Sequence, residues 1–176
     1  MKVLSVNTSG PKPLRSLGQT VMTGIYKTPV AGRVRVHRLG LEGDVQVDQR
    51  VHGGIDKAVY IYPHEHYAHW EKLLSRKDFA FGQFGENLTT IGLLEDDVRV
   101  GTALLQVTQP REPCFKLMTK MNDSTFGQPF LASGRTGFYL RVLEEGEVSA
   151  GDAIERVATD PAAPTIREVV QEQINQ

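Results

Sequence analysis

Cysteine is almost absent from this chain of 176 residues, because Cys114 is the only one. A single thiol cannot form an intramolecular disulfide, which fits the reducing conditions inside a cell. The sequence also lacks a basic start followed by an apolar stretch, and it lacks the run of about 20 apolar residues that a spanning helix needs. We therefore expect a cytoplasmic protein that has no membrane partner and is stabilised by packing alone.

An excess of charge of one sign is also missing. The 20 Lys and Arg residues nearly balance the 21 Asp and Glu residues, so the formal net charge is −1. Proteins that bind nucleic acid neutralise its phosphates with clustered cations, so this balance disfavours nucleic acid as a partner. The apolar fraction of 40% is ordinary for a globular protein. The length fits one compact domain, with or without a small appendage.

Short segments with strand character dominate the first two-thirds of the chain. Their apolar and β-branched residues alternate or run together between turn residues, and the 17 glycines fit that many turns and bulges. The pattern predicts a mainly β fold, a closed or nearly closed β-barrel with a few packed helices. The expected strands are residues 3–6, 21–26, 33–39, 58–62, 97–109 and 137–143.

Few segments show a helical period. Residues 63–74 begin with Pro63, whose fixed φ suits a first helical position, and their apolar residues share one face. Residues 115–121 carry a second, shorter apolar stripe directly after Cys114. We expect both helices to pack on the barrel, and we expect the irregular residues 122–134 to close one mouth of it.

The composition changes at residues 158–165, which we interpret as a linker. Thr165 and Glu168 then form a T-x-x-E capping box that begins a final amphipathic helix. A helix of about ten residues is marginal alone in water, so its apolar stripe must dock on the barrel or on a second copy of the chain in a homodimer. We therefore divide the chain into a β-barrel domain, residues 1–157, and a linker with one helix, residues 158–176.

Three histidines lie close together in HEHYAHW, residues 64–70. The zinc-protease motif needs a second histidine four residues after the first, but position 68 is alanine. We interpret His64, His66 and His69 as structural or surface residues. On the expected helix His69 faces solvent and His66 lies beside the buried face.

A glycine pair in RVHGGIDK, residues 50–57, is a candidate ligand site. Adjacent glycines let a backbone approach a ligand closely and present amide groups to an anion, and the flanking cations favour the same kind of ligand. A tight hairpin turn explains the pattern equally well. The candidate binding residues here are Arg50, His52, Gly53, Gly54 and Lys57.

Two further glycine-rich loops carry polar side chains. In FGQFGENL, residues 81–88, the amide of Asn87 could hydrogen-bond a heterocycle, and the carboxyl group of Glu86 could move protons. The alternative is that Asn87 caps a turn. The third loop, LGLEGD, ends at Asp44. Three such loops exceed what hairpin turns require.

The stretch QPREPCFKL places Cys114 after Pro113, between Arg111 and Lys116, where a strand is expected to end and a helix to begin. Nearby cations and a helix N-terminus favour the thiolate, which is both a nucleophile and a soft metal ligand. One thiolate suffices only for a metal that brings its other ligands with it, so a preassembled metal cofactor is indicated. The alternative is a cysteine that is merely packed as a small apolar residue.

Four blocks, LGLEGD, RVHGGIDKAVYIYPHEHYAHW, FGENL and QPREPCFKL, occur in an order and spacing that resemble the MOSC domain, named from the C-terminal part of molybdenum cofactor sulfurase, and especially its YiiM-like branch. The resemblance covers roughly residues 20–157. It implies a β-barrel that binds the molybdenum cofactor, molybdopterin, with Cys114 as the molybdenum ligand. It further implies that anionic groups of the cofactor lie near Arg50, His52, Gly53, Gly54, Lys57 and Arg111, with Glu86 and Asn87 on the substrate side.

The resemblance also implies a reaction, the two-electron reduction of N-hydroxylated bases or related small compounds. Glu86 or His52 would supply protons, and a partner flavoprotein reductase would supply electrons, because the chain carries no flavin or iron–sulfur motif. YiiM-like proteins typically carry a three-helix domain after the barrel, where this chain has one expected helix. The alternative function is that of a non-catalytic carrier of the molybdenum cofactor or of sulfur.

Overall fold

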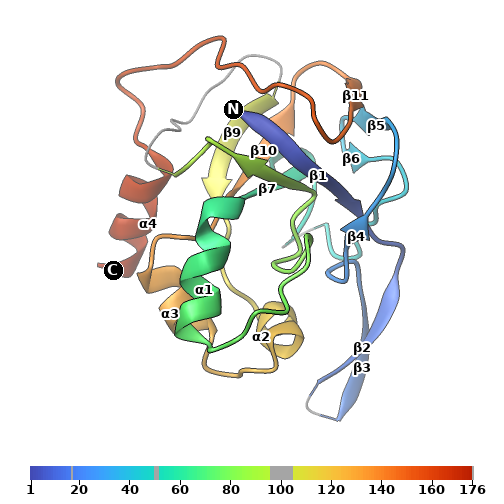
Figure 1. The fold of residues 1–176 in the computed structure, drawn as a ribbon, viewed down its shortest axis with the longest axis vertical. Helices are drawn as coiled ribbons and strands as arrows, with labels where there is room; N and C mark the ends of the chain where they lie inside the picture. Colours follow the sequence, from blue (N-terminus) through green and yellow to red (C-terminus); the bar gives the residue numbers. More distant parts are fainter. Residues whose placement is uncertain (17, 50–51, 96–104, 176) are drawn as a thin grey trace.

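A six-stranded mixed sheet forms the centre of the computed structural model (Figure 1), which describes residues 1–16, 18–49, 52–95 and 105–175. Its strand order is β4-β1-β8-β7-β10-β9, and only the β7–β8 pair is parallel. The strands are β1 (Lys2–Thr8), β4 (Thr28–Pro29), β7 (Val59–Pro63), β8 (Leu88–Ile91), β9 (Leu105–Pro110) and β10 (Phe138–Val142).

Two smaller sheets complete the strands of the described residues. A three-stranded sheet has the order β11-β5-β6, and a two-stranded hairpin, β2–β3, projects away from the body of the molecule (Figure 1). The mainly β prediction is confirmed. Among the described residues no sheet closes on itself, so the barrel stays a prediction. These strands are β2 (Lys12–Ser16), β3 (Gln19–Thr23), β5 (Val34–His37), β6 (Gly40–Leu41) and β11 (Gly146–Val148).

Each predicted strand segment that the structure describes contains or overlaps a strand. Of the segment 97–109, residues 97–104 lie outside the described residues, and β9 accounts for the rest. The strands β2, β4, β6, β8 and β11 were not predicted. β2 contains Pro13, which is tolerated because the hairpin offers an unpaired edge, and β8 has only four residues.

Side chains of β7 alternate between two hydrophobic clusters, as expected for a strand buried on both faces. Val59 and Ile61 belong to an aliphatic cluster, whereas Tyr60 and Tyr62 belong to an aromatic one. Within the aromatic cluster, the ring of Tyr62 stacks on Phe84 with centroids 4.1 Å apart. This aromatic cluster lies beneath the pocket described below.

The predicted helices are present. A 3-10 turn, η2 (His64–His66), leads into α1 (Tyr67–Leu73), and α2 (Phe115–Met121) begins directly after Cys114. Residues 127–132 form a further helix, α3 (Gly127–Ala132), where the sequence predicted irregular chain. Its glycine and proline are poor helix formers, so burial of Phe130 stabilises α3 rather than propensity. A second 3-10 turn, η1 (Ile55–Lys57), precedes β7.

The final helix, α4 (Ile166–Ile174), begins at the predicted capping box. The Thr165 hydroxyl accepts from the Glu168 amide at 3.2 Å, and the Glu168 carboxylate accepts from the Thr165 amide at 2.6 Å. Ile166 and Val170 are buried in the aliphatic cluster, so the stripe docks on the rest of this chain. None of the helices that the structure describes combines the length and apolarity needed to cross a membrane.

The histidines of residues 64–70 make contacts within the fold, in agreement with the structural role that the sequence indicates. His66 is buried, and its Nε2 pairs with the Glu95 carboxylate. His69 is not simply solvent-facing as predicted, because its ring lies edge-on against Trp70 with centroids 4.7 Å apart and is half-buried. Among the described residues, no group of three or more His, Cys, Asp or Glu side chains could hold a metal ion.

Candidate functional site

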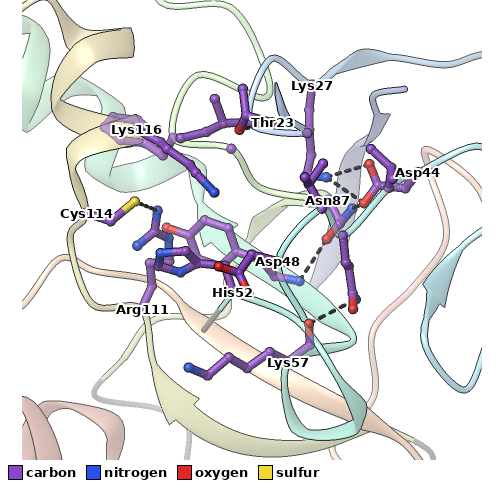
Figure 2. A pocket seen from close by; sticks show the side chains of 18 of the residues that line it. Thr23, Lys27, Asp44, Asp48, His52, Lys57, Asn87, Arg111, Cys114 and Lys116 are labelled. Atoms are coloured by element: carbon purple, nitrogen blue, oxygen red, sulfur yellow. Dashed lines mark hydrogen bonds and ion pairs between the residues drawn. The ribbon is translucent and has the colours of Figure 1, made fainter. Parts of the chain in front are cut away.

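A pocket with about 590 Å³ of empty space, part of it open to solvent, lies between the β9–α2 turn and the loops at residues 23–27 and 44–48 (Figure 2). It brings together residues from all three glycine-rich loops and from the cysteine stretch. Of the predicted site residues, it is lined by His52, Lys57, Asn87, Arg111 and Cys114.

Cys114 reaches this pocket because the strand before it stops and a helix begins after it. β9 ends at Pro110, and Pro113 has no amide hydrogen with which to continue the pairing. Cys114 itself has extended backbone angles, and its carbonyl accepts from the amides of Leu117 and Met118 at 3.0 and 3.1 Å, which begins α2. The thiol therefore lies at a junction, as the sequence predicted.

The thiol of Cys114 is held as a thiolate. Burial raises its pKa, but a hydrogen bond from His52 and the positive charges of Arg111 and His52 outweigh burial and lower the pKa from 9.0 to about 5. Nη2 of Arg111 donates to Sγ at 3.5 Å. At pH 7 the sulfur is therefore negatively charged and can act as a soft metal ligand.

Arg111 has a polar atom without a protein partner. The residue is only 4% exposed, and its guanidinium lies 5.7 Å from the centre of the Tyr60 ring. While Nη2 bonds the thiolate, Nη1 is buried and has no hydrogen-bond partner among the described residues. A buried N–H group without an acceptor costs about 1–3 kcal/mol. This atom is therefore a donor that an acceptor group of a ligand in the pocket could use.

Further cations line the same part of the pocket. Lys116 extends from the first turn of α2 towards the pocket, and His52 lies beside Arg111 (Figure 2). Nζ of Lys57 lies 5.8 Å from the centre of the Tyr139 ring. Sequence reasoning noted Lys116 only as a neighbour of the thiol. We call Cys114, Arg111, His52 and Lys116 the thiolate end of the pocket.

The opposite part of the pocket is an ion-paired network, which we call the closed end: Lys27, Asp44 and Asn87. Nζ of Lys27 lies 2.5 Å from both carboxylate oxygens of Asp44. Burial lowers the pKa of Lys27, and Asp44 offsets part of that effect. The same carboxylate accepts from the Asn87 amide at 2.8 Å and from the Ser9 backbone amide at 2.9 Å.

The amide of Asn87 is also occupied by protein on its oxygen side. Its Oδ1 accepts from the backbone amide of Tyr60 at 3.1 Å, while its Nδ2 donates to Asp44. Asn87 lines the pocket, but both ends of its amide hold neighbouring segments together. Its side chain ties β7 to Asp44 instead of capping a turn.

Glu86 does not line the pocket. Its carboxylate is buried and turned into its own loop, where it accepts from the backbone amides of Gly82 and Phe84 at 2.9 and 3.0 Å. It also accepts from the Thr89 hydroxyl at 2.9 Å and from the Tyr67 hydroxyl. The structure therefore does not bring this predicted proton donor to the other site residues, because four donors hold it inside the fold.

The glycine pair packs against a side chain of the protein, and its predicted role toward a ligand stays a prediction. Gly54 has a φ of 87°, which favours glycine, and its amide donates to Oε1 of Gln46 at 2.8 Å. A Cβ on Gly53 would lie 2.5 Å from the same oxygen. The pair therefore makes room for Gln46, a pocket residue that sequence reasoning missed. Arg50 lies outside the described residues.

The donor set fits a metal that arrives with its other ligands. One thiolate is available, and the described residues offer no other metal-ligand cluster. Cationic side chains and the unpartnered Nη1 of Arg111 surround that thiolate and suit an anionic group. The pocket can therefore hold an anionic metal complex by one sulfur–metal bond and several charge-assisted hydrogen bonds.

Comparisons with known proteins agree on one family. A family model described as the MOSC domain matches residues 48–155. The uncharacterized protein YflK of Bacillus subtilis is 46% identical over 159 residues, which span 87% of this chain and 72% of YflK. Protein YiiM of Escherichia coli is 40% identical over 144 residues, which span 77% of this chain and 64% of YiiM.

Two further matches extend this result. A protein named reductase from Gibberella moniliformis is 32% identical over 148 residues, which span 79% of this chain but only 26% of that protein. The crystal structure of YiiM from Geobacillus stearothermophilus matches with a TM-score of 0.79 and 37% identity, covering 98% of this chain and 83% of that one.

Proposed function

The chain belongs to the MOSC domain family, in its YiiM-like branch, and we propose that it binds the molybdenum cofactor in the pocket and reduces N-hydroxylated bases or related small compounds. The observation that carries the proposal is the thiolate of Cys114 beside the unpartnered Nη1 of Arg111. Together they offer a metal ligand and a hydrogen-bond donor that the protein leaves unused.

The thiolate end would hold the cofactor. Cys114 would ligate molybdenum, and Arg111, His52, Lys57 and Lys116 would face its anionic groups. When bound, the cofactor supplies a metal centre that exchanges two electrons and an oxygen atom with a substrate. The role predicted for Arg50 stays a prediction, and we assign Gly53 and Gly54 to the packing of Gln46 instead.

The reaction needs protons at the substrate. Reduction of an N–OH group to N–H consumes two electrons and two protons and releases one water. Among the predicted proton donors, His52 is at the pocket, and its ring already hydrogen-bonds the thiolate of Cys114. We therefore assign proton delivery to a ring nitrogen of His52 and a structural role to Glu86.

Electrons must come from a second protein. An iron–sulfur cluster is usually held by four cysteines, and this chain has one. We propose a flavoprotein reductase as the donor. The relative named reductase supports an oxidoreductase context, although this chain spans only 26% of it.

A second candidate function is a non-catalytic carrier of the cofactor or of sulfur. The position of Glu86 favours this function. Its carboxylate does not line the pocket, so the pocket has fewer groups that could transfer protons to a substrate. The carrier would bind metal through the same thiolate end but would leave an N-hydroxylated substrate unchanged.

The test uses protein expressed in a host that makes the cofactor, with molybdenum measured per chain. We expect Cys114→Ser to lose the metal and His52→Gln to retain it while turnover of an N-hydroxylated base falls about tenfold or more. His69→Gln is the matched control, because His69 is outside the pocket. Metal retention by Cys114→Ser would reject the ligation. A loaded wild type that stays inactive with a competent donor reductase would favour the carrier.

A further inference from the structure

A second cavity lies across the central sheet from the pocket of Cys114. It has about 1260 Å³ of empty space, part of it open to solvent, and the centre of a water molecule could reach about 360 Å³ of that space. Ligand sites in proteins typically measure about 300–1,000 Å³. The second cavity is therefore large enough for a small molecule, and none of its lining residues also lines the pocket of Cys114.

The central strands separate the two spaces, because successive side chains of a strand point to opposite faces of a sheet. In β7, Tyr60 lines the pocket of Cys114, whereas Ile61 lines the second cavity. In β10, Tyr139 and Leu140 divide in the same way. β11, which also lines the second cavity, lies near the top of Figure 1, and α2 lies near the bottom. The two spaces therefore have different walls and can bind different ligands.

Aliphatic side chains form the inner wall of the second cavity. They come from strands of the central sheet and of the three-stranded sheet, and most belong to the aliphatic cluster. Five of them are each 4% exposed or less: Val3, Ile61, Leu88, Val107 and Leu140. These side chains have no hydrogen-bonding groups, so a polar group placed against them would lose its bonds to water without replacement. The inner wall therefore suits an apolar chain.

Carboxylates surround the mouth of the second cavity. Five of the lining residues are acidic and one is basic, so negative charge dominates there. The acidic residues are Glu144, Glu145, Glu147, Asp152 and Glu155, and the basic one is Arg156. The combination of an apolar interior with a few charged groups at the opening is typical of sites that bind small molecules.

Two of these carboxylates are free to meet a ligand. Arg33 lies 3.4 Å from Glu147 and 3.2 Å from Asp152, and Glu145 accepts from the backbone amide of Arg38 at 2.9 Å. The other two, Glu144 and Glu155, are exposed, and their side chains have no ion pair or hydrogen bond within the part of the chain that the structure describes.

We propose that the second cavity binds a small cationic amphiphile, whose apolar chain lies against the inner wall and whose ammonium group lies at Glu144 and Glu155. An ammonium group suits the mouth because its hydrogen bonds to carboxylates are charge-assisted. An anionic head group would meet like charges at the same place. The proposal goes beyond the proposed function and does not depend on it, because the two sites share no residue.

The test measures binding to the full chain by isothermal titration calorimetry, with each amphiphile below its micellar concentration. We expect one decylammonium ion to bind per chain. Decanoate has a similar chain but a negative head group, so it should bind about tenfold more weakly or worse. Ethylammonium has the cationic head but almost no apolar chain, so it should give no detectable binding.

Variants test the interior and the mouth separately. Ile154 lines the cavity and is half-buried, and Ile154→Phe should weaken decylammonium binding about tenfold or more by filling the space. The double variant Glu144→Gln, Glu155→Gln should remove most of the preference for decylammonium over decanoate. The matched control is Glu71→Gln, Glu172→Gln, which removes two carboxylates from α1 and α4, outside the cavity, and should change neither affinity.

Three results would overturn the proposal. One is the absence of decylammonium binding to the wild type, and another is equal binding by the wild type and a folded Ile154→Phe variant. The third is equal affinity of the wild type for decylammonium and decanoate. If circular dichroism shows that Ile154→Phe does not fold, Ala153→Trp, at an exposed position of the same wall, is measured with the same criteria.

Sedimentation velocity of the ligand-free chain tests the other occupant that an apolar cavity could have, which is a second copy of the chain. We expect a monomer whose sedimentation coefficient is unchanged in Ile154→Phe. A dimer that dissociates in Ile154→Phe would show that a second copy covers the cavity, and the amphiphile proposal would then be wrong.

Discussion

The two ends of the pocket differ in whether their polar groups already have partners. At the closed end, Asp44 is shared among Lys27, Asn87 and the Ser9 amide, so its oxygens are used by the protein. At the thiolate end, Nη1 of Arg111 has no partner among the described residues, although it is buried. A group with all its hydrogen bonds made can bind a ligand only by breaking one of them. Nη1 of Arg111 could therefore bond a ligand at the thiolate end without the loss of a bond within the protein.

The difference does not follow from residue type. Both ends combine a lysine with an anionic group. Glu86 is an acidic residue like Asp44, and its carboxylate accepts hydrogen bonds from four donors of the protein. Counting partners separates groups that stabilise the fold from groups that are left for chemistry. The comparison predicts that mutations at the closed end lower the free energy of unfolding, whereas mutations at the thiolate end weaken ligand binding.

The largest effect on stability is expected from Glu86→Ala. The change leaves four donors inside the fold without an acceptor, at about 1–3 kcal/mol for each. We expect the free energy of unfolding to fall by more than about 4 kcal/mol, measured by chemical denaturation at pH 7. A decrease in the free energy of unfolding of less than about 1 kcal/mol would show that the hydrogen bonds of the Glu86 carboxylate do not stabilise its loop. Glu86 would then again be a candidate for catalysis.

The next effect concerns the ion pair of the closed end. Asp44→Asn leaves Lys27 buried without its anion, and breaking a buried pair in this way costs about 3 kcal/mol. The same denaturation experiment checks this value. Asp78→Asn is the control, since Asp78 pairs with Arg76 on the surface and its loss should leave the free energy of unfolding nearly unchanged. Equal effects of the two variants would mean that the closed end is open to solvent and no different from the surface.

Local signals in the sequence predicted much of this architecture. α4 follows its capping box, and α2 starts after Cys114, because each depends on residues within a few positions of one another. β8 was missed because a short strand is stabilised by its neighbours in the sheet, which are distant in sequence. β2 was missed because it contains Pro13, which argues against a strand in the sequence pattern. The contact between Arg111 and Cys114 could be expected from the sequence for the same reason as the helices, because the two residues are three positions apart.

The other site predictions differ from the geometry for one physical reason: a sequence does not show which partners a polar side chain hydrogen-bonds. Nothing in FGQFGENL reveals that the loop folds its own amides onto Glu86. Gln46 was missed because its partners lie between 7 and 12 residues away and are backbone groups, which leave no signature in side-chain pattern. The glycine pair did signal a close approach, and within the described residues the group that approaches it is Gln46.

A third prediction concerns pH and sharpens the description of the thiolate end. The pKa of Cys114 is lowered from 9.0 to about 5 in the folded chain, so folding favours the thiolate. A group with a depressed folded pKa stabilises the fold fully above the unfolded value, and this contribution is lost as the pH falls to the folded value. Relative to Cys114→Ser, the wild type should therefore gain about 2 kcal/mol between pH 5 and pH 7 in metal-free protein. Parallel stability curves for the two proteins would contradict a low pKa.

The smallest effect on stability is expected for Lys116→Gln. Lys116 is half-buried at the edge of the thiolate end, and its Nζ lies 5.9 Å from the centre of the Phe115 ring. We expect the free energy of unfolding to change by less than about 0.5 kcal/mol, whereas binding of inorganic phosphate to the metal-free pocket should weaken several-fold. Phosphate affinity from calorimetry and denaturation of the same samples measure both quantities. A loss of stability comparable to that of Asp44→Asn, with unchanged phosphate affinity, would contradict this prediction. It would mean that Lys116 interacts with groups of the protein, as Lys27 does at the closed end.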